Sequence, residues 1–194
     1  MSTTSATYVL DRGFSRRAAI RSGPRRLISA VKTSARFGVL SLCAGVLVFS
    51  MQDAILKISR STGRLDWILG THDNWRSPWS GKLLRPLGSL EWPFHQHDAT
   101  FTSRRTVLCF DNGNHRASPP ETKMPPELCY SRAVEYEVDG TNGTVRQVWE
   151  YGKDREDRLF SVYVGGARRL TATGNVLIDF GGIVRNASGA YQEN

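Results

Sequence analysis

The feature that most constrains the fold of this chain is a hairpin pattern that occurs twice. Residues 54–69 and 132–149 each contain two β-rich runs on either side of a turn with glycine, which is typical of an antiparallel hairpin. Both hairpins end in the pattern Trp-x-x-Gly, which begins at Trp67 and Trp149. The two tryptophans are 82 residues apart, or two steps of about 41 residues, which is close to the length of a β-propeller blade.

Short apolar runs form a second repeat, at residues 46–49, 107–110 and 176–179. The steps between these runs are 61 and 69 residues, so long insertions must separate the strands. Two segments rich in Pro, Gly and Asn, residues 71–93 and 113–129, supply them, and loops of this length are usually functional. We therefore predict propeller blades with the long loops gathered at one mouth, and an antiparallel sandwich or meander is the alternative.

The length of the chain limits the number of blades. Residues 41–194 are expected to form roughly two to three blades, whereas a closed propeller needs at least four. The predicted fold class is therefore all-β, with a partial β-propeller over residues 41–194 and a basic segment of low order over residues 1–40. An incomplete ring leaves strand edges exposed, so we expect self-association through such edges.

The positive charge of the chain is concentrated near its start. The formal net charge is +8, but residues 1–36 hold eight basic residues and one acidic residue, so the remainder carries only +1. A nearly neutral folded part argues against nucleic acid as its partner, and any nucleic-acid binding is expected in the leader alone.

The basic leader does not match an export signal well. Arg16 and Arg17 form a twin-arginine pair, but further basic residues interrupt the apolar segment that should follow it. No run approaches eighteen apolar residues, so we predict no membrane-spanning helix. The leader is interpreted as irregular or targeting-like, and the cellular location stays open between cytoplasm and export.

The three cysteines indicate no metal or redox motif. Cys43, Cys109 and Cys129 contain no C-x-x-C spacing, so neither a zinc ribbon nor a thioredoxin-like site is supported. Cys109 lies in an apolar run, where a buried free thiol is the expected state.

Two of the four histidines lie close together, in the segment 92–101. If this segment is a strand, His95 and His97 share one face. Metal binding by this His-x-His pair would need a third ligand, such as Asp111 or His115. The alternative for His95 is a packed or capping side chain, and no further ligand spacing supports the metal.

His97 is better suited to act as a nucleophile. A neutral imidazole attacks phosphorus or sulfur near pH 7, and the site then needs cations or donors to hold the anionic group in transfer. The segment 110–116 follows one predicted strand later and supplies Asn112 and Arg116 as supporting residues, with His95 as a further candidate. The alternative is a polar turn with a solvated Arg116.

Several motifs, in order along the chain, resemble those of the arylsulfate sulfotransferase family. The resemblance covers roughly residues 46–185 and is centred on the Gln-His-Asp-Ala sequence at residues 96–99. The segments that carry it are residues 66–70, 74–75, 92–102, 110–113, 130–136 and 148–152.

The resemblance implies a six-bladed propeller fold and a sulfuryl transfer between phenols that uses no nucleotide sulfate donor. The implied mechanism is ping-pong through a sulfated histidine, and the nucleophile of the family maps onto His97. The implied partners are a small aryl sulfate and a phenol, no metal or other cofactor is needed, and exported family members imply a periplasmic location.

The chain departs from the family pattern in two places. The family has Arg-His directly before a glutamine, whereas Ser50 and Met51 precede Gln52 here, so a cation that would hold the sulfuryl group is missing. The upstream blades are also replaced by the basic leader. We therefore expect a truncated member with reduced or no activity alone. The alternatives are a metal-dependent hydrolase at His95 and His97, or a non-catalytic binding module with Trp75, Trp79 and Trp92 as anchors.

Overall fold

The computed structural model describes residues 2–10, 46–49, 53–117, 122–185 and 188–191. Within these ranges the chain is all-β, and its single helical element is the short 3₁₀ turn η2 (Trp79–Lys82). None of the described segments is a helix long and apolar enough to cross a lipid bilayer. The all-β prediction is therefore confirmed.

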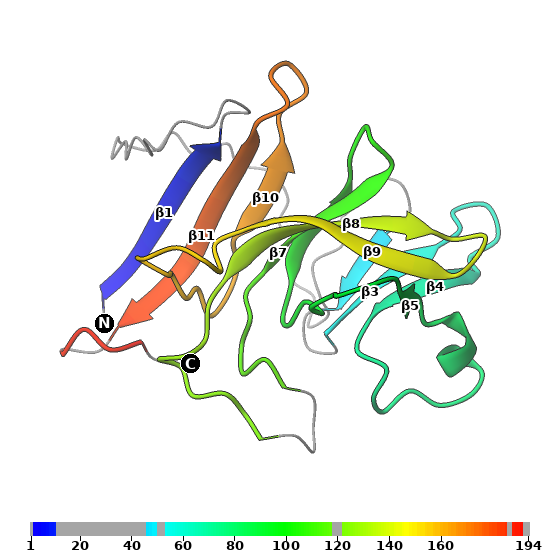
Figure 1. The fold of residues 1–194 in the computed structure, drawn as a ribbon, viewed down its shortest axis with the longest axis horizontal. Coiled ribbons are helices and arrows are strands. Elements are labelled where there is room, and N and C mark those ends of the chain that lie inside the picture. Colours follow the sequence, from blue (N-terminus) through cyan, green and yellow to red (C-terminus); the bar gives the residue numbers. More distant parts are fainter. Residues whose placement is uncertain (1, 11–45, 50–52, 118–121, 186–187, 192–194) are drawn as a thin grey trace.

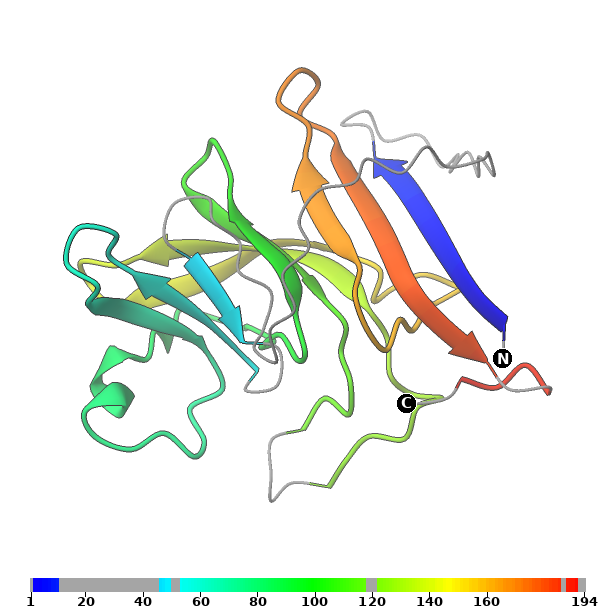
Figure 2. The same cartoon turned by 180° about the vertical axis from the view of Figure 1, so that it is seen from behind.

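The strands form three separate sheets (Figures 1 and 2). The central sheet is an antiparallel meander of β6 (His97–Phe101), β7 (Thr106–Asp111), β8 (Arg132–Asp139) and β9 (Thr144–Tyr151), with β5 (Arg85–Pro86) parallel to β9. A second sheet contains β2 (Val46–Phe49), β3 (Ala54–Ile58) and β4 (Leu65–Gly70) in that order. The third has the order β1 (Ser2–Leu10), β11 (Val176–Arg185) and β10 (Gly166–Arg169).

The central sheet is covered on both faces. Every residue of β7 is buried, as expected for a strand with packing on both sides. Val107 and Cys109 join the core shared with the β2–β3–β4 sheet, and Leu108 and Phe110 join the core shared with the β1–β11–β10 sheet. Strand β6 lies where the three sheets meet, because β2 packs against it from one side and β10 from the other.

The repeat in the sequence is a repeat in the structure. Both predicted hairpins are present, as β3–β4 and β8–β9, and each has an irregular register at the equivalent position. Trp67 packs into the core between its own sheet and the central sheet, and Trp149 packs against the core between the central sheet and the third sheet. Each hairpin therefore directs its tryptophan at the next sheet along the chain.

The glycines of the two Trp-x-x-Gly patterns also occupy equivalent positions. A Cβ atom on Gly70 would lie 2.5 Å from the Asp53 carbonyl oxygen, and one on Gly152 would lie 2.6 Å from the Ser131 carbonyl oxygen. Gly152 also has a φ of +129°, which side-chain-bearing residues rarely adopt. The close approach of the paired backbones explains why glycine follows the tryptophan at this spacing.

Replacing Gly152 by alanine should lower the free energy of unfolding by about 2–3 kcal/mol, because the methyl group adds a backbone clash to an unfavourable φ. Chemical denaturation would measure the change. Gly81→Ala is the matched control, since a Cβ there meets nothing within 4 Å. Equal stabilities for the two variants would contradict this account of Gly152.

The three sheets do not close into a ring. The strands expected from the apolar runs at residues 46–49, 107–110 and 176–179 are all present as β2, β7 and β11. Residues 71–93, 113–117 and 122–129, the described parts of the two long connections, lie toward the lower side of the molecule in both views (Figures 1 and 2). The packing of successive sheets is established, whereas the propeller arrangement stays a prediction.

The segment expected to be irregular contains a strand. Residues Ser2–Leu10 form β1, which pairs antiparallel with β11 from Ser2–Arg185 to Leu10–Val176. The run contains three Thr, one Tyr and one Val, residue types that favour strands, and β11 provides the edge with which it pairs. Residues 11–45, including Cys43 and the twin arginines, lie outside the described residues, so the domain boundary near residue 40 stays a prediction.

Candidate functional site

His97 is the first residue of β6, and an irregularity in that strand sets its direction. His97 pairs with Phe110, but Thr100 pairs with Leu108, so β6 has one more residue than β7 between these two pairs. Asp98 absorbs the extra residue with a φ of +50°, a conformation that aspartate tolerates better than most side chains. The bulge turns the His97 imidazole toward the turn that follows β7.

The His97 ring is held by the amide of Asn112. Its Nδ1 atom lies 2.7 Å from Asn112 Oδ1 and 3.1 Å from the His95 carbonyl oxygen. Asn112 Nδ2 donates to the carbonyl oxygens of Ser161 at 2.7 Å and Val164 at 2.8 Å, which fixes the orientation of this buried amide. Both groups near Nδ1 are acceptors, so Nδ1 carries the proton.

The neutral His97 ring therefore has its lone pair on Nε2. Among the residues that the structure describes, this nitrogen makes no hydrogen bond, and the side chain is partly exposed. An imidazole that is protonated and oriented at one nitrogen and free at the other is arranged to act as a nucleophile or base.

Each residue of the turn 111–114 has a separate structural role. Asp111 Oδ1 accepts from the Phe94 backbone N–H at 2.9 Å, and the Gly113 N–H donates back to the Phe94 carbonyl at 2.9 Å. Gly113 has a φ of +75°, and a Cβ there would lie 2.1 Å from the Tyr130 carbonyl oxygen. Asn114 Nδ2 donates to the Val162 carbonyl at 2.8 Å. These contacts fix the backbone that carries Asn112.

His95 does not share the strand with His97. It lies in the turn before β6 with a φ of +50°, so the expected common strand face does not form. Its backbone N–H donates to Asp53 Oδ1 at 2.6 Å, and its Nδ1 lies 3.2 Å from the same oxygen. The His115 ring is 6.4 Å from the His95 ring, edge to face.

Arg116 is buried rather than solvated. Its side chain is 3% exposed, and its Nη1 lies 3.1 Å from Glu91 Oε1 and 3.2 Å from Asp111 Oδ2. Its Nη2 donates to the Tyr130 carbonyl at 2.6 Å, and the guanidinium lies 3.6 Å from the centre of the Tyr130 ring. The interpretation as a solvated turn residue is wrong, because the Arg116 side chain is itself buried and pairs with the buried Asp111 and the partly buried Glu91. A role in holding a sulfuryl group stays a prediction.

Arg116 belongs to a larger set of buried and half-buried ionic groups, named here the charge cluster. At its centre, Arg132 is fully buried and donates to Asp111 at 2.8 Å and to Glu91 Oε2 at 3.1 Å. It also contacts Glu150, and Lys153 reaches Glu91 Oε2 at 2.9 Å. The cluster has three cations and three carboxylates: Glu91, Asp111, Arg116, Arg132, Glu150 and Lys153.

Glu91 is the carboxylate that receives most of these contacts. Burial alone would raise its pKa, but Arg132, the Tyr130 hydroxyl, Lys153 and Arg116 together lower the pKa of Glu91 from 4.5 to about 2. Burial raises the pKa of the Tyr130 phenol, which therefore stays a neutral donor to Glu91. The Tyr136 hydroxyl donates to the Glu91 backbone carbonyl at 2.8 Å and holds the residue in place.

The lowered pKa of Glu91 predicts a loss of stability in acid. The ionised Glu91 makes its full contribution to the free energy of unfolding above the unfolded pKa near 4.5. This contribution disappears as the pH falls from about 5 to about 2. Denaturation midpoints measured across this range should fall for the wild type and fall less steeply for Glu91→Gln, which starts from a lower stability. Parallel pH profiles for the two proteins would contradict the assignment.

Asp98, next to His97, faces the third sheet. It lies 3.4 Å from Arg168 Nη2, and a Cβ on Gly166 would lie 2.9 Å from its carboxylate. Burial raises the pKa of Asp98, and Arg168 opposes that rise. Asp98 therefore connects the bulge beside His97 to β10.

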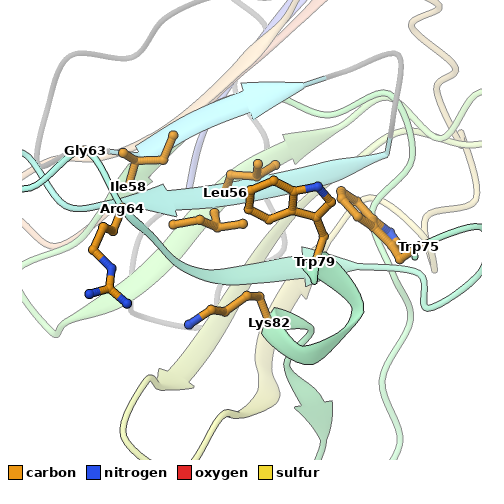
Figure 3. Close-up of a pocket in the computed structure, with 8 residues that line it drawn as sticks. Leu56, Ile58, Gly63, Arg64, Trp75, Trp79 and Lys82 are labelled. Atoms are coloured by element: carbon orange, nitrogen blue, oxygen red, sulfur yellow. The ribbon is translucent and has the colours of Figure 1, made fainter. Parts of the chain in front are cut away.

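His97 lines neither of two cavities found in the described part of the chain. One, of about 570 Å³, lies on the β2–β3–β4 sheet and is lined by Trp75 and Trp79 (Figure 3). The other, of about 520 Å³, lies between the turns after β6 and β10. Trp92 contacts the His72 ring and packs against the core, so it does not join the other two tryptophans.

Candidate metal ligands do not converge. In the described ranges no group of three His, Cys, Asp or Glu side chains has a metal-binding arrangement. Asp111, one proposed third ligand, is fully buried against Arg132. Cys109 is a buried free thiol, as predicted, and Cys129 is buried as well.

No motif in the sequence pointed to the members of the charge cluster other than Asp111 and Arg116. Arg132 and Glu150 lie in β8 and β9, the strands of the predicted second hairpin. The repeat did contain a signal for the burial of Arg132. Arg132 occupies the position equivalent to Ala54 in the other hairpin, and Ala54 is buried.

The fold and the site together define an all-β protein of stacked antiparallel sheets that presents one oriented histidine beside an asparagine turn. The chain belongs to the arylsulfotransferase (ASST) family, whose family model matches residues 45–193. It is 31% identical over 156 residues to the arylsulfate sulfotransferase AssT of Escherichia coli O6:H1, and 33% identical over 133 residues to the protein of the same name from Lelliottia amnigena.

These similarities cover unequal shares of the chains. The matched region is 72% of this chain and 25% of the E. coli protein, and 60% of this chain and 22% of the L. amnigena protein. The chain therefore spans about a quarter of the length of the curated relatives it matches. The departure at Ser50 and Met51 lies outside the described residues.

Proposed function

We propose that this chain transfers a sulfuryl group from an aryl sulfate to a phenol through His97 Nε2. The observation that carries the proposal is the hydrogen bond from His97 Nδ1 to Asn112 Oδ1, because it places the ring lone pair on the other nitrogen. The family of the chain supports the substrate class. The name of its two relatives, arylsulfate sulfotransferase, agrees with that class.

In the first half-reaction, His97 Nε2 attacks the sulfur of the aryl sulfate. A nitrogen–sulfur bond forms, the bond from sulfur to the aryl oxygen breaks, and the phenolate leaves with the electron pair. The ring becomes positively charged, which strengthens the hydrogen bond from Nδ1–H to Asn112 Oδ1. The orientation of Asn112 thus favours the charge that develops on the imidazole.

In the second half-reaction, the oxygen of an acceptor phenol attacks the same sulfur after losing its proton to solvent. The nitrogen–sulfur bond breaks, and His97 regains its neutral form. Splitting the transfer into two steps lets a single anion site serve donor and acceptor in turn.

The test is to incubate the whole chain with 4-nitrophenyl sulfate and to measure its intact mass. The expected result is an increase by one SO₃ group with release of 4-nitrophenol, and peptide mapping places the added group on His97. The second half-reaction is tested by adding a phenol, which should remove the added mass. If the protein does not gain the mass of one SO₃ group at any donor concentration, the proposal is wrong.

A binding module without catalysis is the second candidate function, and the open cavity with Trp75 and Trp79 favours it. Trp79 is 51% exposed, which is unusual for so large an apolar side chain. The mass measurement distinguishes the two candidates, since a binding module forms no covalent adduct.

A further inference from the structure

The turns that follow β6 and β10 enclose the cavity of about 520 Å³, at the end of β6 opposite His97. His97 is the first residue of β6, whereas the cavity is lined by the last residues of that strand and by the two turns. Both turns lie at the upper edge of the molecule in both views (Figures 1 and 2). Strands β6 and β10 are in contact, so the cavity lies at the junction of the central sheet and the third sheet.

The lining of this cavity is polar and positively charged. Three of its residues are arginines and five carry hydroxyl groups, whereas none of the lining residues is acidic. The residues are Arg104, Arg168 and Arg169, with Thr100, Thr102, Ser103, Thr171 and Thr173. Guanidinium and hydroxyl groups are hydrogen-bond donors, so the cavity suits a ligand that has negative charge and several acceptor oxygens.

Two of the arginines are available to such a ligand. Arg104 is exposed and has no ion pair among the described residues. The Arg168 side chain is 67% exposed, and it lies 3.4 Å from Asp98 Oδ1. Charge-assisted hydrogen bonds are usually about 2.7–2.9 Å long, so Asp98 holds this guanidinium weakly. An anion in the cavity therefore competes with Asp98 for Arg168.

The third arginine holds the walls of the cavity in place. Arg169 Nη2 lies 2.5 Å from Glu135 Oε2, and its Nη1 donates to the Gly174 carbonyl oxygen at 2.8 Å. Arg169 therefore connects the turn after β10 to the central sheet, and Glu135 balances its charge. In the other turn, the Arg104 backbone N–H donates to Thr102 Oγ1 at 3.1 Å. Ligand binding costs less where the walls of a site are already ordered.

Three hydroxyl groups of the lining are also available. The side chains of Thr100, Ser103 and Thr171 make no hydrogen bond to other described residues. The hydroxyls of Thr102 and Thr173 accept hydrogen bonds within their own turns. The cavity therefore combines two available cations with several hydroxyl groups.

We propose that this cavity binds a sugar that carries a phosphate or sulfate group. Arg104 and Arg168 bind the oxyanion, and the hydroxyls of Thr100, Ser103 and Thr171 bind the hydroxyl groups of the sugar. The volume lies within the range of small-molecule sites, about 300–1,000 Å³, which gives room for more than an inorganic ion. Phe101 is the single aromatic residue of the lining, which favours a polar ligand over an aryl one.

Isothermal titration calorimetry of the whole chain with glucose 6-phosphate, glucose 6-sulfate and glucose tests the proposal. The expected result is saturable binding of one or both esters, with a dissociation constant below about 1 mM, and no binding of glucose. Added sodium chloride should weaken the binding because it screens the arginines. The ester that binds more tightly identifies the preferred group. His97→Ala should bind it as the wild type does, so the test does not depend on the chemistry at His97.

Substitutions at the cavity should change the affinity in both directions. Arg104→Gln and Arg168→Gln should each raise the dissociation constant by about tenfold, because each removes a charge-assisted hydrogen bond. Asp98→Asn should lower it by about two- to threefold, because it removes the carboxylate that competes for Arg168. Asparagine also tolerates the φ of +50° at this position. Arg60→Gln is the matched control, at an exposed arginine in the β3–β4 turn that lines neither cavity, and should leave the affinity unchanged.

Four outcomes would overturn the inference. The first is no saturable binding of either ester up to about 10 mM. The second is binding of glucose as tight as that of its esters. The third is an Arg60→Gln variant that loses as much affinity as Arg104→Gln, with circular dichroism showing both variants folded. The fourth is loss of binding in His97→Ala, which would place the ester at His97.

Discussion

Replacing Arg132 by methionine is expected to lower the free energy of unfolding by about 3–5 kcal/mol. Arg132 is fully buried and donates to Asp111, Glu91 and the Glu91 backbone carbonyl. Methionine fills a similar volume but leaves these carboxylates with one cation fewer in a buried setting, where an uncompensated charge is costly. Since small domains are stable by only about 5–15 kcal/mol, this loss removes much of the folded population.

The control for Arg132 is another strand arginine with a carboxylate partner. Arg146 pairs with Glu137 on the same sheet, but the two side chains are 60% and 53% exposed. Arg146→Met should therefore change the stability by about 0.5 kcal/mol or less. Urea denaturation of both variants tests the difference. Equal effects would mean that the charge cluster does not stabilise the fold as described.

Replacing His97 by alanine should abolish formation of the sulfated protein, and replacing Asn112 by alanine should slow it by about a hundredfold or more. Without the Asn112 oxygen, the proton of His97 is no longer held at Nδ1 by its closest acceptor, so a smaller fraction of the rings has a free Nε2. The rate of adduct formation with 4-nitrophenyl sulfate is the measurement for both variants.

Asn114→Ala is the matched control for Asn112→Ala. Its amide also donates to a carbonyl of the segment 161–164, at Val162, but it does not touch His97. The rate for Asn114→Ala should therefore stay within about threefold of the wild type. If the two asparagine variants lose the same activity, Asn112 acts by holding the turn together and the orientation of His97 is not its role.

The charge cluster is connected to the hydrogen-bonded pair of His97 and Asn112 through Asp111. Asp111 pairs with Arg132 through one carboxylate oxygen and accepts from the Phe94 backbone through the other. The next residue is Asn112, so the charge cluster anchors the backbone that presents the amide to His97. Weakening the charge cluster should therefore also reduce the rate of the histidine chemistry, even where the protein remains folded.

The hairpins were predictable because strand alternation, glycine turns and the Trp-x-x-Gly spacing are local signals. From the sequence, His97 and Asn112 could be predicted only to lie near each other, because their strands are consecutive in the chain. Their hydrogen bond depends on the bulge at Asp98, and no residue pattern fixes where a register shifts by one residue.

The amino-acid sequence by itself determined the class of fold, the repeat of hairpins and the position of the candidate nucleophile, since each depends on residues close together in the chain. Only the tertiary structure decided that Arg116 is buried, that Arg132 and Glu91 join it in the charge cluster, and that His95 leaves the strand. Those outcomes depend on contacts between segments up to 62 residues apart, as between Lys153 and Glu91, and on the loss of solvent around them. The sequence alone does not distinguish a charged residue in water from one that is paired with a buried partner.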